Sequence, residues 1–100
     1  MNKNTLKNET WVWAIIQNPE KNESFLGQYD ETNNIRFIPA FYSKDASVRC
    51  INQLKKDESL VYESQAILYE DLVNYTKQNG FLIFFLDDKG KILDKIAPLE

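Results

Sequence analysis

The sequence predicts an α+β domain in which a mostly antiparallel sheet carries two packed helices, in the order β-β-β-α-β-α-β-β. Short segments rich in β-branched and aromatic residues alternate with turn formers, which is typical of strands. Two other segments place apolar residues at helical spacing. The chain has 100 residues, of which 43% are hydrophobic and 27% charged, and this suits one domain with its own core. We expect residues 1–9 to form a flexible lead and residues 10–100 a single domain.

The first three strands are expected at residues 10–17 (TWVWAIIQ), 24–30 (SFLGQYD) and 35–42 (IRFIPAFY). The loops between them are too short for crossovers, so the strands should form an antiparallel meander. Asn33 and Asn34 can take the left-handed conformation of a tight turn. Pro39 has no amide hydrogen, so the third strand should be at a sheet edge, bulged, or bordered on that side by solvent.

The first helix is expected after Ser43, whose hydroxyl can cap it, and Asp45 suits its first turn. One arc of the helix carries the apolar or small residues Ala46, Ser47, Cys50, Ile51 and Leu54. The opposite side carries the cations Lys44, Arg49, Lys55 and Lys56, the last two in the final turn.

The second half of the chain should contain three strands and one helix. A strand is expected at residues 60–67 (LVYESQAI), and a helix at 68–79 that ends at Gly80. The segment FLIFFL (81–86) has no polar face, so both of its sides should be covered and it should be a central strand. The turn DDKG (87–90) then leads into a returning strand, KILDKI (91–96).

Several kinds of chemistry are excluded by composition. The chain has no His, so Ser-His-Asp and Cys-His catalysis cannot occur within it. The single Cys50 can form neither an internal disulfide nor a multi-cysteine zinc site, and we expect it to fill the core. The three glycines are too far apart for a phosphate-binding loop. Asp87 and Asp88 are best interpreted as exposed turn formers. We therefore expect no catalytic residue, metal or cofactor, and a non-enzymatic protein is favoured.

Charge and hydropathy suggest where the protein works. The net charge of −3 weighs against a nucleic-acid partner, because phosphate neutralisation needs cations. The first residues contain no apolar segment of the kind found in signal peptides, and the longest apolar run is too short to span a bilayer. We expect a cytoplasmic protein without a membrane partner.

Two groups of side chains are candidates for binding another protein. The first is the basic helix face, which could dock an acidic surface and which contains Lys44, Arg49 and Lys56. The second group contains the aromatic residues Trp11, Trp13, Phe41 and Tyr42. These residues would form a protein-binding surface if one face of the sheet were left uncovered.

The segment FIPAFYSKDASVRCI resembles a strand-to-helix signature, Pro-hydrophobic-aromatic-Ser/Thr-x-x-x-Ala, in small bacterial domains of unknown function and in SseB-like N-terminal domains. The matching positions are Pro39, Phe41, Ser43 and Ser47. WVWAIIQ and QAILYEDLVNYTKQNGFLI resemble the remaining elements, so the similarity covers most of the chain. The resemblance implies a bacterial α+β domain and offers no catalytic residues to carry over.

Three functions are therefore compatible with the sequence. The first is a non-enzymatic protein-interaction or regulatory module, whose partner is another protein; a homodimer is compatible with it. The second is a small immunity or anti-toxin protein, which size and acidity fit equally well. The third is a small-molecule sensor or an enzyme, with a pocket between sheet and helices that uses Tyr, Asp or Lys groups.

Overall fold

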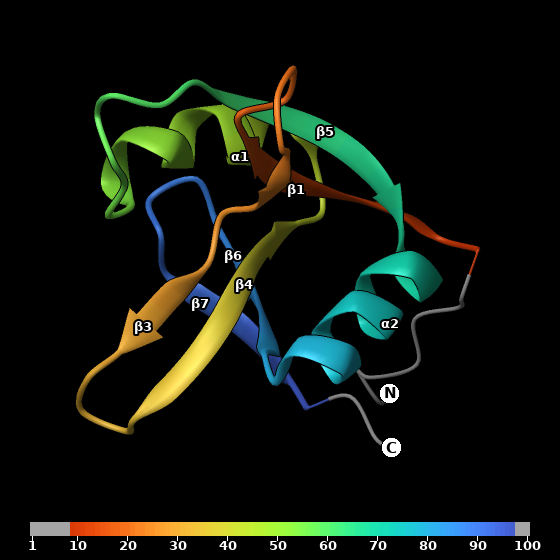
Figure 1. Cartoon of the computed structure of the whole chain (residues 1–100). Helices are drawn as coiled ribbons and strands as arrows, with labels where there is room; N and C mark the ends of the chain where they lie inside the picture. The colour runs from red at the N-terminus through yellow and green to blue at the C-terminus, as the bar shows by residue number, and fades with distance from the viewer. Residues whose placement is uncertain (1–8, 98–100) are drawn as a thin grey trace.

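A computed structural model describes residues 9–97 as one α+β domain, with a seven-stranded sheet and two helices on its opposite faces (Figure 1). This confirms the predicted fold class. The elements are β1 Trp11–Gln17, β2 Ser24–Phe25, β3 Gln28–Asp30, β4 Ile35–Phe41, α1 Lys44–Cys50, the 3₁₀ turn η1 Ile51–Gln53, β5 Tyr62–Leu68, α2 Tyr69–Asn79, β6 Leu82–Leu86 and β7 Ile92–Ile96. The expected flexible lead falls almost entirely on residues 1–8, which lie outside the described residues.

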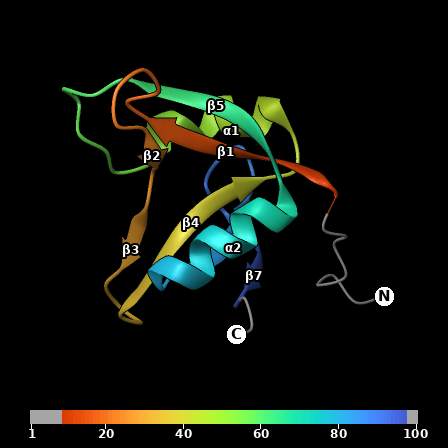
Figure 2. The same ribbon diagram turned by 45° about the vertical axis from the view of Figure 1, so that its right-hand side comes forward.

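The sheet is mostly antiparallel, as predicted, and β4 lies at its centre. One side of β4 pairs with β3 and β1, and its other side pairs in parallel with β6, which in turn pairs with β7. β1 also pairs with β2 and, along its whole length, with β5. Figure 2 shows α1 beside β1 and β5, and α2 lying across β4.

The order of strands differs from the prediction because the second expected strand is divided into β2 and β3. Leu26 interrupts the strand and is buried, and its amide donates to the Ile15 carbonyl at 2.8 Å. At Gly27 the backbone passes so close to Phe81 that a Cβ atom would lie 3.1 Å from the ring. The chain bends here and changes its pairing partner from β1 to β4. A lone glycine within a strand pattern is the sequence signal for such a bend.

β4 is an internal strand, so the expectation that Pro39 marks an edge is wrong. Phe37 pairs with β3, Ala40 pairs with β1, and Pro39 lies between these two pairings. The missing amide hydrogen therefore falls where the strand changes partner, and an internal strand tolerates it there.

The hydrophobic core has two layers, one on each face of the sheet. The layer under α2 includes Val12, Ile38, Ala40, Leu72, Ile83 and Phe85. The layer under α1 includes Ile15, Leu26, Phe41, Cys50, Phe84 and Leu86. β6 contributes to both layers, which confirms that FLIFFL contains a strand covered on both sides.

α1 begins as predicted but ends early. The Ser43 hydroxyl accepts a hydrogen bond from the Ala46 amide at 3.2 Å. After Cys50 the helix tightens into η1, and Leu54 is extended, with ψ of 150°. Lys55 and Lys56 therefore lie outside the helix, and their expected placement in its last turn is wrong. Both Ile51 and Leu54 still contact the core, so apolar spacing alone could not reveal the change.

α2 ends at Gly80, as predicted, where φ is +75° and the amide donates to the Thr76 carbonyl. Asn34 takes the predicted left-handed conformation with φ of +55°, which Asn33 does not share. Between residues 9 and 97, neither helix has the length and apolar character needed to cross a bilayer.

Candidate functional site

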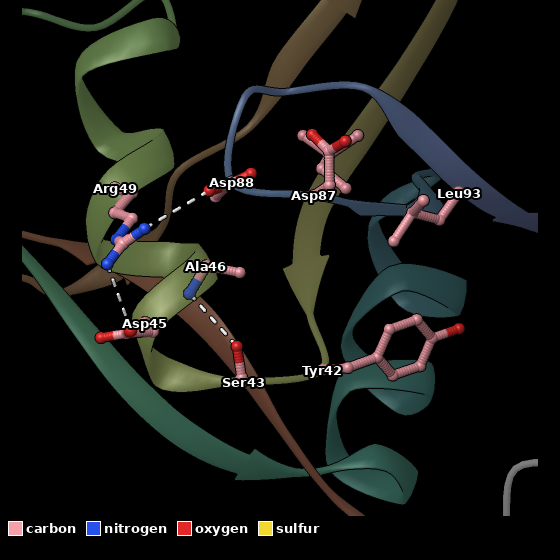
Figure 3. Close-up of a pocket in the computed structure, with 9 residues that line it drawn as sticks. Tyr42, Ser43, Asp45, Ala46, Arg49, Asp87, Asp88 and Leu93 are labelled. Carbon is pink, nitrogen blue, oxygen red and sulfur yellow. Dashed lines mark hydrogen bonds and ion pairs between the residues drawn. The ribbon is translucent and has the colours of Figure 1, made fainter.

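An open groove of about 340 Å³ lies where β4 runs into α1 and where β6 turns toward β7 (Figure 3). We call it the junction groove. It is lined by Tyr42, Ser43, Asp45, Ala46, Arg49, Leu86, Asp87, Asp88 and Leu93. More than half of these residues belong to the strand-to-helix segment FIPAFYSKDASVRCI (residues 37–51).

The pairing of β4 with β6 explains why the groove forms. The two strands are parallel neighbours, so their carboxyl ends meet at one edge of the sheet. Crevices outside the carboxyl ends of parallel strands are common binding sites in α/β sheets. In β7, Asp94 lies opposite Phe85 and Ile92 opposite Leu86, so Leu93 is an extra, bulged residue. A bulge redirects a side chain, and Leu93 lines the groove.

Tyr42 forms one wall of the groove and is held in place from two directions. Its ring stacks on Phe85 with the centroids 4.3 Å apart, and its hydroxyl donates to Asp94 Oδ2 at 2.6 Å. Burial, together with the hydrogen bond to the Asp94 carboxylate, raises the pKa of Tyr42 well above its ordinary value. The phenol is therefore neutral at physiological pH, and 45% of the residue remains exposed.

Arg49 lies between two carboxylates at the opposite wall (Figure 3). Its guanidinium is 3.6 Å from Asp45 Oδ2 within α1 and 3.7 Å from Asp88 Oδ2 in the β6–β7 turn. All three side chains are well exposed, so these ion pairs add little stability and can exchange for other partners.

Asp87 organises the turn that closes the groove. Its Oδ1 accepts from the amides of Lys89 and Lys91 at 2.9 and 2.8 Å, and the hydrogen bond from Lys91 is the main reason why the pKa of Asp87 is lowered. Gly90 has φ of +86°, which confirms the predicted turn. The lining thus combines the apolar residues Ala46, Leu86 and Leu93 with three carboxylates and one guanidinium.

The cations expected on one helix face are separated in the structure. Arg49 lies in the junction groove, whereas the Lys44 ammonium lies 5.8 Å from the ring centroid of Trp13. The Lys56 side chain is only 13% exposed and pairs with Glu58 at 3.6 Å. A continuous basic patch built from these three residues does not form.

The candidate aromatic residues are also separated. Tyr42 lines the junction groove, Trp11 is 61% exposed on β1, and Trp13 is half-buried. Phe41 is completely buried in the layer under α1, so it cannot contact a partner in this fold. Sequence reasoning missed Leu93, because strand alternation gives no sign of the bulge that brings it into the groove.

Cys50 is a core residue, as predicted, and is completely buried. Burial, and to a lesser extent the negative charges of Asp87 and Asp88, raise the pKa of its thiol from 9.0 to about 11. The thiol therefore stays protonated in the folded protein under physiological conditions. A buried, protonated thiol is unreactive and has no nucleophilic role.

We expect ionisation of the Cys50 thiol to lower the free energy of unfolding in alkaline solution. Its raised pKa contributes stability that is fully present below pH 9.0 and is lost as pH rises toward 11, because the unfolded chain loses the proton first. Urea unfolding of the wild type and Cys50→Ala from pH 8 to pH 10.5 measures this effect. The wild type should lose stability with pH more steeply than the variant, and parallel pH profiles would contradict the assignment.

A second open groove, of about 460 Å³, lies beside β3. The Arg36 guanidinium covers the Phe81 ring at 4.4 Å from its centroid, and Lys55 pairs with Glu31 at 3.8 Å. Both grooves lie open at the surface. Within residues 9–97, no three Cys, Asp or Glu side chains converge into a group that could hold a metal ion.

Comparisons with protein-family models, with curated proteins and with solved structures found no match to this chain, so the resemblance to SseB-like N-terminal domains stays a prediction from the sequence.

Proposed function

We propose that this protein is a non-enzymatic protein-interaction module and that the junction groove is its docking site. The observation that carries the proposal is an open groove whose lining joins the apolar residues Ala46, Leu86 and Leu93 with four charged side chains. Binding surfaces commonly combine an apolar centre with a polar edge. A small immunity protein would be one form of such a module.

The polar groups of the groove suit the binding of a partner better than they suit catalysis. The Ser43 hydroxyl caps α1, and the Tyr42 hydroxyl is neutral and bonded to Asp94. The Arg49 guanidinium is held by two carboxylates. A nucleophile needs a base hydrogen-bonded to it, whereas the hydrogen bond that the Ser43 hydroxyl makes within the described residues is with the Ala46 amide.

The charges of the lining favour a partner with a basic residue next to an apolar one. Asp45, Asp87 and Asp88 outnumber Arg49, so the groove itself is acidic even though Arg49 lies within it. A cation of the partner can replace Arg49 in the ion pair with Asp45 or Asp88, because the present ion pairs are exposed and weak. This is opposite in sign to the acidic partner that the sequence suggested for the helix face.

The prediction is tested by selecting random displayed peptides on the immobilised protein and repeating the selection on two variants. Leu93→Asp places a charge in the apolar part of the groove lining, whereas Ile92→Asp places the same charge on the neighbouring residue. Leu93 and Ile92 are 44% and 41% exposed, so the two variants should disturb the fold equally. Only Leu93 lines the groove.

We expect peptides with a basic residue beside an apolar one to bind the wild type and Ile92→Asp, and to bind Leu93→Asp at least about tenfold more weakly. Amide chemical shifts of the wild type should change around Ala46 and Leu86 when such a peptide is added. Equal binding to both variants, or shifts confined to other surfaces, would remove the junction groove as the docking site.

A further inference from the structure

β5 presents an open edge of the sheet. Its seven residues pair with β1 along the whole strand, and β1 is its one strand partner within residues 9–97. Although β5 is fully paired on that side, none of its residues is buried. In Figure 2 β5 is the uppermost strand of the sheet, with β1 beside it.

Two hydrogen bonds reveal which amides of β5 point away from β1. The Asn18 amide donates to the Val61 carbonyl, and the Tyr69 amide donates to the Thr10 carbonyl, both at 2.8 Å. Hydrogen-bonded positions alternate along an antiparallel pair. The odd-numbered residues from 61 to 69 therefore bond to β1. The open edge presents the amide and carbonyl groups of the even-numbered residues, Tyr62, Ser64, Ala66 and Leu68.

The other edges of the sheet are protected and β5 is not. β7 carries Lys95 and the bulge at Leu93, while β2 and β3 are only two and three residues long. Lysines, bulges and short strands are the usual means of preventing edge-to-edge pairing. β5 contains no Pro, Lys or bulge, and the carboxylate of its one charged residue, Glu63, accepts from Gln65 Nε2 at 2.7 Å.

We propose that β5 pairs antiparallel with β5 of a second copy of this chain, about a two-fold axis through Gln65. Gln65 is the middle residue of the strand, so this register alone pairs β5 along its full length. Ser64 then lies opposite Ala66 of the second copy, and each such pair exchanges both of its backbone hydrogen bonds.

The side chains are compatible with this register. Glu63 lies opposite Ile67 of the second copy, so like charges do not meet. The axis is perpendicular to the sheet, so both copies of α1, which is tied to β5 by the Ser47–Ser64 hydrogen bond, lie on the same face of the joined sheet. Leu68, which pairs with Trp11 on the β1 side, lies opposite Tyr62 of the second copy in this register. An apolar cross-strand pair thus forms at each end of the new ladder.

The test is the mass of the protein in solution from about 1 to about 500 µM, by light scattering and sedimentation equilibrium. The wild type should reach twice the 11.7 kDa chain mass as concentration rises. Ala66→Pro removes an outward amide without touching the β1 ladder and should stay monomeric. Ala66→Thr is the control, since it keeps the amide and suits a strand, and it should dimerise like the wild type.

Hydrogen exchange of the wild type gives a second result that needs no variant. The Ser64 and Ala66 amides should exchange quickly in dilute protein and become protected as concentration rises. The proposal is overturned if the wild type stays monomeric at every concentration, or if Ala66→Pro dimerises like the wild type. In either case the β5 edge would be available to a strand of another protein. β5 is not part of the junction groove, so Leu93→Asp should dimerise normally, and this result is independent of peptide binding.

Discussion

Replacing Phe84 with Ala is expected to lower the free energy of unfolding by about 3–5 kcal/mol. Phe84 is completely buried in the layer under α1 and stacks on Phe37 with the ring centroids 4.2 Å apart. The two core layers hold β6 from both sides, so neighbouring side chains can fill the cavity only in part. The midpoint of thermal unfolding should fall by at least about 12 °C in a domain of this size. Urea unfolding and calorimetry measure both quantities.

Trp11→Ala is the control for this measurement, because it also removes a large aromatic ring. Trp11 is 61% exposed, and we expect its loss to change the stability of the monomer by less than about 1 kcal/mol. The comparison should be made in dilute protein, so that association does not contribute. Similar losses from both variants would contradict the position of Phe84 between two covered layers.

The central position of β6 could be predicted because its cause is local. A strand without a polar face must be covered on both sides, and Ile83 and Phe84 indeed belong to opposite layers. The cap at Ser43 and the left-handed Gly80 and Gly90 were predictable for the same reason, since each depends on one residue and its immediate neighbours.

Features that depend on distant contacts were missed. The end of α1 could not be found from spacing, because Ile51 and Leu54 reach the same core layer from a 3₁₀ turn and an extended residue. Pro39 was expected at an edge because the sequence does not show that β4 changes partner there. The division of β2 from β3 had a sequence signal in Gly27, whose close approach to Phe81 becomes clear only in the fold.

The candidate site was predicted only in part. The sequence pointed to Tyr42 and Arg49, but the wall that faces them comes from the β6–β7 turn, more than thirty residues later in the chain. The charge of the site also depends on this wall. Asp88 supplies a carboxylate to Arg49, so a helix face that looks basic in isolation becomes part of an acidic groove.

Gln65→Pro is expected to destabilise the domain by on the order of 3 kcal/mol, whereas Ala66→Pro should cost less than about 1 kcal/mol. The Gln65 amide points toward Ala14 of β1, and Ala14 is completely buried. Proline at position 65 therefore leaves a buried carbonyl without its donor and places a ring against the neighbouring strand. At position 66 the missing amide faces outward. Urea unfolding of the two variants, in dilute protein, measures the difference.

This pair of variants separates the orientation of β5 from its association. If proline is equally damaging at both positions, the alternation of amides along β5 is wrong, and the proposed pairing of two copies loses its basis. If only Gln65→Pro is damaging, the outward amides are established whether or not the protein dimerises. Ala66→Pro is then a folded protein with a changed edge, so its mass in solution reports on association alone. The stability measurement should therefore come before the test of oligomeric state.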